Sequence, residues 1–236
     1  MISVIIPAYN EEKSILKCLD SLNRQKTSKE FEIIVVNNVS TDKTAEVINA
    51  YKTKVPIRII DDPVKGRGHA RYTGFANATG DIIFSTDSDT ELPENWLEKL
   101  SSYFENTAVV GVTSQAKVTD LSTVSNFIFN YAHLAIILIY KLVTGHYWFN
   151  GFSFAVRKDA YFKAGQFNPI LNTEEDVDLS NRVAKMGKIK FAREVPVVFS
   201  SRRFKRGVFI GLAEYIIGYA VYLFGNKAKA DLSDIR

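Results

Sequence analysis

The sequence predicts an α/β protein built on a doubly wound, mainly parallel sheet with helices on both faces. Short apolar segments alternate with amphipathic segments along the first half of the chain, which is the pattern of strands and helices in such folds. The strand segments are apolar at almost every position, as expected of strands that helices cover on both faces. Near the C-terminus, an apolar segment predicts one further apolar or amphipathic helix.

Length and composition fit one sizeable folded domain. The chain has 236 residues, of which 46% are hydrophobic and 24% are charged, as in ordinary soluble proteins. Its net charge of +4 is mild and gives little support to nucleic-acid binding. The single cysteine, Cys18, excludes an internal disulfide and a multi-cysteine metal site. Because the N-terminal sequence is too short and too acidic for a signal peptide, we expect a cytoplasmic protein.

The first half of the chain predicts four strands, each followed by a helix. The strands are expected at residues 3–6, 31–36, 55–60 and 82–85. Asn10 is a residue type that caps helices, and the apolar residues behind it recur at helical spacing. Ser40 or Thr41 is expected to begin the second helix, and a glycine-punctuated loop leads into the third. Pro93 suits the first turn of the fourth helix, which is expected to end at Phe104.

The second half of the chain is less regular. Its expected elements are a strand at 109–113, an apolar segment at 127–143, a strand at 148–156, helices at 158–164 and 173–186, and strands at 188–193 and 196–199. Residues 208–224 are the most apolar segment, and a basic cluster at 202–206 precedes them. This combination favours a helix on an anionic membrane surface, with 127–143 beside it. Cover of the sheet or of a dimer partner is the alternative.

The strand at 82–85 leads directly into a pair of acidic residues. Asp87 and Asp89 are two positions apart, so on an extended backbone their side chains share one side. Two neighbouring carboxylates repel each other unless a cation lies between them, and a hard divalent ion prefers oxygen ligands. An acidic turn that caps the next helix is the alternative. The polar residues at 7–10 and 37–38 also follow strands, and the carboxyl ends of parallel strands meet at one ligand-binding edge.

Five motifs occur in an order typical of one enzyme family. They are VIIPAYNEE, NNVSTDKT, ATGDIIFSTDSD, NGFSFAVRKDAYFKAGQF and EEDVDLSNRVAKMG, which lie between Val4 and Gly187. In these motifs the chain resembles family 2 glycosyltransferases, which have the GT-A fold. The resemblance implies a GT-A domain over residues 1–200 and a basic, apolar tail at 201–236. Within the domain it implies a nucleotide-sugar-binding half at 1–115 and an acceptor and catalytic-base half at 116–200.

The resemblance also implies how a sugar-nucleotide donor is held. Asp89, with Asp87 sharing the ion or holding the ribose, is the implied ligand of Mn²⁺ or Mg²⁺. The implied donor nucleotide-binding residues are Pro7, Ala8, Tyr9, Asn10, Asn37, Asn38, Arg71 and Asp87. The family usually has an aspartate at one of the positions of Asn37 and Asn38, and commonly a glycine at Val39. Both a UDP-sugar and a GDP-sugar therefore stay open, and so does a purely structural role of the two asparagines in the turn.

Glu175 and Asp176 match the acidic pair that supplies the catalytic base in the family. The resemblance implies that Asp176 removes a proton from the acceptor in a single, inverting displacement. A helix-capping role of Asp176 with Thr173 is the alternative reading of the same residues. The implied acceptor or sugar contacts are Trp148, Asn150, Gly151, Arg202 and Arg203.

The expected acceptor is a hydroxyl or phosphate of a cell-envelope glycan or a glycolipid, including a polyprenyl-linked one. The expected location is cytoplasmic or on the cytoplasmic face of a membrane. A homodimer is left open, and no nucleic-acid partner is expected. A nucleotidyltransferase-like enzyme and a non-catalytic sugar-nucleotide or glycan-binding module are the rival functions, although the chain lacks a glycine-rich triphosphate loop near its N-terminus.

Overall fold

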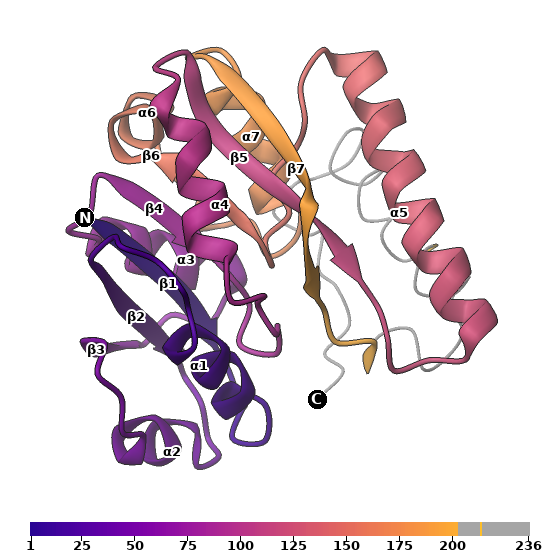
Figure 1. The fold of residues 1–236 in the computed structure, drawn as a ribbon. Helices are drawn as coiled ribbons and strands as arrows, with labels where there is room; N and C mark the ends of the chain where they lie inside the picture. The colour runs from indigo at the N-terminus through magenta and orange to yellow at the C-terminus, as the bar shows by residue number, and fades with distance from the viewer. Residues whose placement is uncertain (203–212, 214–236) are drawn as a thin grey trace.

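The computed structural model describes residues 1–202 and Ala213. Arg203 and the apolar segment at 208–224, on which the tail helix was expected, therefore lie outside the described residues. Within them the chain forms a seven-stranded sheet with helices packed around it (Figure 1). The strands are β1 (Ile2–Ala8), β2 (Phe31–Asn38), β3 (Ile57–Asp62), β4 (Ile82–Ser85), β5 (Val109–Lys117), β6 (Phe154–Arg157) and β7 (Lys188–Val198).

The sheet has the order β3-β2-β1-β4-β6-β5-β7. The four N-terminal strands run parallel, whereas β6 pairs antiparallel with both β4 and β5. β7 returns parallel to β5. The prediction of a mainly parallel, doubly wound sheet is confirmed, and β6 is the reversed strand. Because the order runs outward in both directions from β1 and β4, the carboxyl ends of these two strands lie at a topological switch point, where such sheets bind ligands.

Helices cover both faces of this sheet. They are α1 (Ile15–Asn23), α2 (Thr44–Ala50), α3 (Arg67–Ala76), α4 (Trp96–Ser102), α5 (Thr123–Thr144), α6 (Lys158–Lys163) and α7 (Glu175–Val183), with a 3₁₀ turn at Tyr103–Glu105. Side chains alternate along β1, so Val4 and Ile6 face α1 and α4 whereas Ile5 faces α3. The two resulting cores are apolar throughout, which explains the almost uninterrupted apolar strands of the sequence.

Several predicted boundaries are wrong, for local reasons. β1 continues through Pro7 to Ala8, although proline lacks an N–H group for the ladder. Asn10 does not cap α1, because that helix begins only at Ile15 with Ser14 at its cap position. The two strands expected near the C-terminal end of the domain are the single strand β7. Of the expected strand at 148–156 only residues 154–156 join the sheet, as part of β6.

α5 lies along the β5 and β7 side of the molecule, apart from the other helices (Figure 1). It begins at Ser122, whose hydroxyl accepts a hydrogen bond from the Ser125 N–H group, and ends at Gly145 in the left-handed conformation (φ 83°). Its length and composition would allow it to cross a membrane, and among the described residues it is the only helix for which this holds.

Gly74 tests how closely α3 packs on the sheet. A Cβ atom at this position would lie 2.3 Å from Ile5 Cγ2 and 3.0 Å from Val36 Cγ2. We expect Gly74→Ala to lower the free energy of unfolding, because overpacking costs about 1–3 kcal/mol whereas the better helix propensity of alanine returns about 1 kcal/mol at most. Urea unfolding measures the difference. Ala76→Gly, on an exposed position of the same helix, is the control for propensity alone. A Gly74→Ala protein that is more stable than the wild type would contradict the close approach.

Candidate active site

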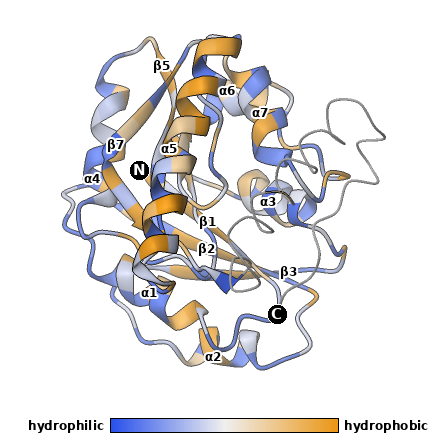
Figure 2. Cartoon of the chain, turned by 90° about the vertical axis from the view of Figure 1, so that its right-hand side faces the viewer, coloured by the Kyte–Doolittle hydropathy of each residue, from blue (hydrophilic) through white to orange (hydrophobic). Residues whose placement is uncertain are grey.

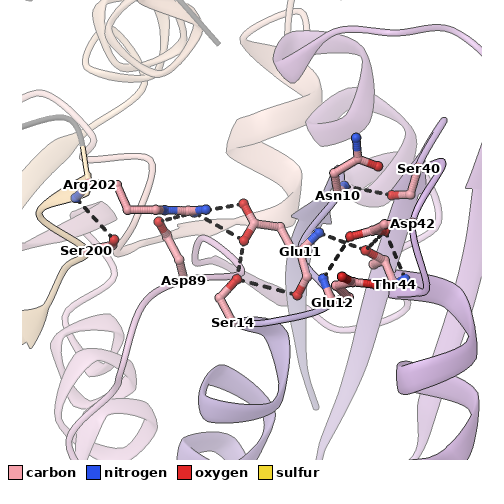
Figure 3. Close-up of polar contacts among 10 residues, drawn as sticks. All are labelled: Asn10, Glu11, Glu12, Ser14, Ser40, Asp42, Thr44, Asp89, Ser200 and Arg202. Carbon is pink, nitrogen blue, oxygen red and sulfur yellow. Dashed lines mark hydrogen bonds and ion pairs between the residues drawn. The ribbon is translucent and has the colours of Figure 1, made fainter. Parts of the chain in front are cut away.

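The loops after β1 and β2 are tied together by side chain–backbone hydrogen bonds (Figure 3). Asn10 Oδ1 accepts from the Thr41 N–H group at 2.8 Å, and Ser40 Oγ accepts from the Asn10 N–H group at 3.0 Å. One turn further, Thr44 Oγ1 accepts from the Glu11 N–H group at 2.7 Å. Asn10 therefore links the two loops at the carboxyl edge of the sheet, which places it in the predicted donor site with a structural task that the sequence did not reveal.

Arg71 is the only described cation that is almost completely buried; it is 3% exposed. One of its terminal nitrogens donates to Asp87 Oδ1 at 2.6 Å, and the other donates to Glu175 Oε1. A single guanidinium thus joins the end of β4 to the first residue of α7. The expected contact of Arg71 with the nucleotide stays a prediction, because in this structure both terminal nitrogens are bonded to carboxylates.

Asp176 lies beside this ion pair and is held by two backbone groups. The Gly151 N–H group donates to Asp176 Oδ2 at 2.7 Å, and the Val177 N–H group donates to Oδ1 at 2.8 Å. Burial, followed by the neighbouring Glu175 carboxylate, raises the pKa of Asp176 to about 7, although Arg71 and the two N–H groups act in the opposite direction. A carboxylate with a pKa near neutrality is suited to proton transfer at physiological pH.

Gly151 is placed so close to these groups that it has no room for a side chain. A Cβ atom there would lie 2.5 Å from Arg71 Nη2 and 3.2 Å from Asp176 Oδ2. The sequence singled out Gly151 as a residue near the acceptor or sugar. The structure adds that its N–H group orients Asp176. This role belongs to the backbone, so the residue type does not reveal it.

The start of α7 carries a further acidic group that the sequence analysis did not single out. Glu174 precedes the helix in the left-handed conformation (φ 56°), and burial next to Asp176 and Glu175 raises its pKa to about 8. The Thr173 hydroxyl is buried without a hydrogen-bond partner and no side chain caps α7. The alternative reading of Asp176 as a partner of Thr173 in a capping pair is therefore wrong.

Asp89, two residues after Asp87, faces the guanidinium of Arg202 (Figure 3). Arg202 Nη2 lies 2.6 Å from Asp89 Oδ2, and 2.9 and 3.1 Å from the two carboxylate oxygens of Glu11. Glu11 is 5% exposed, and sequence reasoning missed it. Its only signal was its place directly after Asn10 in the polar loop behind the first strand.

The residues around Asp89 fit a divalent cation. Asp89 and Glu11 supply hard carboxylate oxygens, and in this structure a guanidinium occupies the position between them. No cluster of three or more His, Cys, Asp or Glu side chains suited to a metal occurs in the described part of the chain. One or two carboxylates are enough for an ion such as Mg²⁺ when substrate phosphates and water supply the other ligands.

The two asparagines after β2 have different surroundings. Asn38 is saturated: its amide donates to Asp62 Oδ2 and the Val64 carbonyl, and it accepts from the Gly66 N–H group. Asn37 donates to Asp61 Oδ1 at 2.7 Å, but its own Oδ1 is buried without a partner. The structural role in the turn therefore holds for Asn38, whereas Asn37 keeps a free acceptor at the strand end.

The remaining predicted donor residues, Pro7, Ala8 and Tyr9, lie at the end of β1. Pro7 and Ala8 are the last residues of β1. The Tyr9 ring lies 4.4 Å below Lys65 Nζ, which also lies 3.1 Å from the Tyr9 hydroxyl. This contact brings a positive charge to the loop in front of α3, next to the predicted nucleotide position.

Trp148 and Asn150 are largely occupied with each other and with β5. The Trp148 indole N–H group donates to Asn150 Oδ1 at 2.7 Å, and the Asn150 amide donates to the Ser114 carbonyl at 2.8 Å. Asn150 is 4% exposed, so it supports the neighbouring Gly151 by position. Contact of Trp148 with an acceptor sugar stays a prediction.

Backbone strain gathers at this edge of the sheet. Of the described non-glycine residues with positive φ, Asn10 (54°), Val39 (52°) and Glu174 (56°) all lie in its loops. For the β-branched Val39 this conformation is costly, and it explains why glycine is commonly found at this position. Such strain tends to persist where a binding site requires a defined loop shape.

Comparison with known proteins agrees with this architecture. Residues 3–165 match the family model described as Glycosyl transferase family 2, and the chain belongs to this family. Glycosyltransferase AglE of Haloferax volcanii is 36% identical over 111 residues, which cover 46% of this chain and 36% of AglE. The match spans less than half the length of AglE and of other curated relatives.

Two solved structures show that the fold is GT-A. The mannosyltransferase PcManGT from Pyrobaculum calidifontis, in complex with GDP-Man and Mn²⁺, has a TM-score of 0.74 at 21% identity and covers 96% of this chain and 65% of its own. TarS of S. aureus, in complex with UDP-GlcNAc, has a TM-score of 0.65 at 19% identity and covers 98% of this chain and 68% of its own.

Arg71→Met tests the buried ion pairs. It would leave Asp87 and the buried Glu175 without their cation, and breaking a buried pair in this way costs about 3–5 kcal/mol. We expect a loss of this size in the free energy of unfolding at pH 7, measured in urea. The loss should shrink at pH 4, because burial raises the pKa of Asp87, and without Arg71 this carboxyl takes up a proton and no longer needs a counter-ion.

Lys163→Met is the matched control. Lys163 pairs with Asp159 on α6 at 3.2 Å, and both side chains are more than half exposed. Removal of such a surface pair is expected to cost less than about 1 kcal/mol at either pH. Equal losses for the two variants would show that Arg71 does not hold the site together.

Proposed function

We propose that this protein is an inverting, divalent-metal-dependent glycosyltransferase that moves a sugar from a nucleotide-sugar donor to an acceptor hydroxyl or phosphate. The observation that carries the proposal is Asp176, an oriented carboxylate whose pKa is raised to about 7. It follows Glu175, which Arg71 links to Asp87 through two ion pairs. These residues lie at the edge of the sheet where α/β folds bind nucleotides. Membership in the glycosyltransferase family supports the same assignment.

In the proposed reaction Asp176 is the general base. It takes the proton of the acceptor hydroxyl while that oxygen forms a bond to the anomeric carbon. The bond between the anomeric carbon and the diphosphate breaks on the opposite side, and the electron pair leaves with the nucleoside diphosphate. One displacement of this kind inverts the anomeric configuration. The N–H groups of Gly151 and Val177 hold the carboxylate in place, and a base held in this way contributes about two to four decades in rate.

Mn²⁺ or Mg²⁺ would be held by Asp89, with Asp87 and Glu11 as the nearest acidic neighbours. When bound, such an ion offsets the negative charge that develops on the departing diphosphate. PcManGT was solved with Mn²⁺ and GDP-Man, which supports this choice of ion. Arg202, now paired with Asp89 and Glu11, would then have its positive charge available to the diphosphate.

The proposed donor is a UDP- or GDP-sugar. Uracil and guanine both carry a ring N–H group, and the unpaired Asn37 Oδ1 is a suitable acceptor for it. The relatives support both choices, because TarS was solved with UDP-GlcNAc and PcManGT with GDP-Man. A cell-envelope glycan or a lipid-linked carrier is the proposed acceptor class.

Asp176→Asn tests the general base. We expect donor binding to change little and transfer to fall by about two to four decades, since an amide cannot take the proton. The matched control is Asp178→Asn, two residues along α7, where the carboxylate pairs with Arg182 at 2.7 Å. Single-turnover rates and donor titrations separate the two effects. Full transfer by Asp176→Asn would end the assignment.

The pH dependence of kcat/KM reports the same group in the free enzyme. Because the base acts in its deprotonated form and its pKa is about 7, kcat/KM should rise with pH up to about 7 and then level off. The same shift makes the folded state less stable as pH rises from about 4 to 7, since the unfolded carboxylate ionises first. A rate that stays constant from pH 5 to 8 would exclude this base.

Removal of the metal tests whether donor binding requires an ion at Asp89. In a panel of UDP- and GDP-sugars with Mn²⁺, the true donor should raise the melting temperature, because a ligand that binds only the folded state stabilises it. EDTA should abolish the effect, and Asp89→Asn should weaken it. Asp159→Asn, on the exposed side of α6, is the control. Undiminished donor binding in EDTA would contradict metal dependence.

A further inference from the structure

The amphipathic pattern of α5 is inverted. Its polar side chains face the protein: Asn130 bonds to Val118, Tyr140 donates to Asn181 Oδ1 at 2.7 Å, and the His133 ring lies 6.0 Å from the Phe152 ring between centroids. Burial lowers the pKa of His133 to about 4, so this side chain is neutral at physiological pH. The polar groups of the helix are thus used for contacts with the domain.

The outward side of α5 is apolar along its whole length. We call this surface the α5 stripe; it consists of Val124, Phe127, Tyr131, Ala135, Leu138 and Leu142. These residues follow the i, i+3, i+4 and i+7 spacing of one helix face. The exposed fraction is 60% for Phe127 and 85% for Leu142. Only 11% of the most apolar window of the helix is buried, and in Figure 2 α5 lies toward the viewer with several orange, hydrophobic segments along its ribbon. A surface of this kind marks an interaction site.

A second copy of the chain is the alternative occupant of this stripe, and sedimentation distinguishes the two occupants.

Charge favours an anionic lipid surface. Phe199 stacks against Phe129 of α5 with a centroid distance of 6.2 Å, so the chain passes beside this helix directly before Arg202. The sequence continues with Arg203, Lys205 and Arg206. An exposed apolar helix and a cluster of basic residues in the sequence match the two attractions that hold interfacial helices on anionic bilayers. The neighbouring rings of Phe127 and Tyr131 on the stripe, 4.3 Å apart between centroids, also suit the headgroup region, where aromatic side chains gather.

α5 is not free to cross a bilayer. Its inner side packs on β5 through Phe129, Ala116 and Val118. Its polar inner residues are bonded to the domain, and insertion of the helix would pull β5 and its neighbours in the sheet into the hydrocarbon. The geometry therefore favours a helix that lies in the plane of the interface.

We propose that the α5 stripe docks this protein on an anionic lipid bilayer. The same helix reaches the active site: Tyr140 packs edge-on against Trp148 at 4.8 Å between centroids, and its hydroxyl bonds to α7. Docking through the stripe thus fixes α7 and Asp176 relative to the lipid surface, where a lipid-linked acceptor would reside. This consequence rests on the proposed function, whereas docking itself does not.

Site-specific labelling tests the docking. Cys18 is the only cysteine and is buried, so an introduced cysteine is labelled selectively. The full chain with Leu138→Cys carries an environment-sensitive fluorophore on the stripe. Leu16→Cys is the matched control, since Leu16 is 40% exposed on α1, which lies away from α5 (Figure 1). Vesicles contain phosphatidylcholine alone or with phosphatidylglycerol.

The proposal predicts a blue shift of the label at 138, and none at 16, only with vesicles that contain phosphatidylglycerol. High salt should weaken it. Flotation of unlabelled protein should show that Phe127→Ser with Leu142→Ser reduces vesicle binding by at least about tenfold, whereas Leu16→Ser does not.

Three results would overturn the proposal. A label at 138 that is shielded in buffer in a monomeric protein would show that residues 203–236 cover the stripe. A dimer in sedimentation that the double substitution converts into a monomer would identify a second copy as the occupant. An unchanged label with anionic vesicles, or an equal response to neutral ones, would exclude an anionic bilayer.

Neither binding readout depends on sugar transfer. If Asp176→Asn binds vesicles as the wild type does but transfers no sugar, docking and catalysis are separate properties of the chain. Failure of docking with intact transfer would reject this inference alone.

Discussion

The burial of one guanidinium between two carboxylates is the constraint on which the site depends. Arg71 is held by the sheet-facing side of α3, Asp87 by the end of β4, and Glu175 by the start of α7. A charge buried this deeply is tolerated only with partners, so the three elements cannot move independently. Because Asp176 directly follows Glu175, these ion pairs also fix the position of Asp176. Burial and the neighbouring negative charge then raise its pKa toward neutrality.

The sheet could be predicted because its signals are local. Apolar strands such as Phe31–Asn38 and Ile82–Ser85 exclude most other structures, and their alternation with helices indicates a parallel sheet. The errors arose where context outside the segment decides. Pro7 is accommodated inside β1, and Asn10 bonds to Thr41 across 31 positions of sequence instead of capping the helix that follows it. No periodicity within one segment reports such partners.

The sequence predicted only part of the candidate active site, for the same reason. Asp87, Asp89 and Asp176 stood out by spacing and family resemblance, and the structure brings their elements to one edge of the sheet. Glu11 was missed because its significance comes from Arg202, 191 positions away. The orienting N–H group of Gly151 was invisible too, because backbone donors leave no mark on a sequence. Asn37 and Asn38 are identical in type, and only their partners separate the structural residue from the one with a free acceptor.

The central claim is that the folded protein shifts the ionisation of Asp176 into the neutral range. Titration of the side-chain carboxyl carbons by ¹³C NMR, with the Asp176→Asn protein used to assign the signal, measures this shift directly. We predict a midpoint near pH 7 for Asp176, well above the value of about 3.9 for aspartate in model peptides. A midpoint near 4 for Asp176 would contradict the account, since the carboxylate would then have no special proton affinity to offer an acceptor.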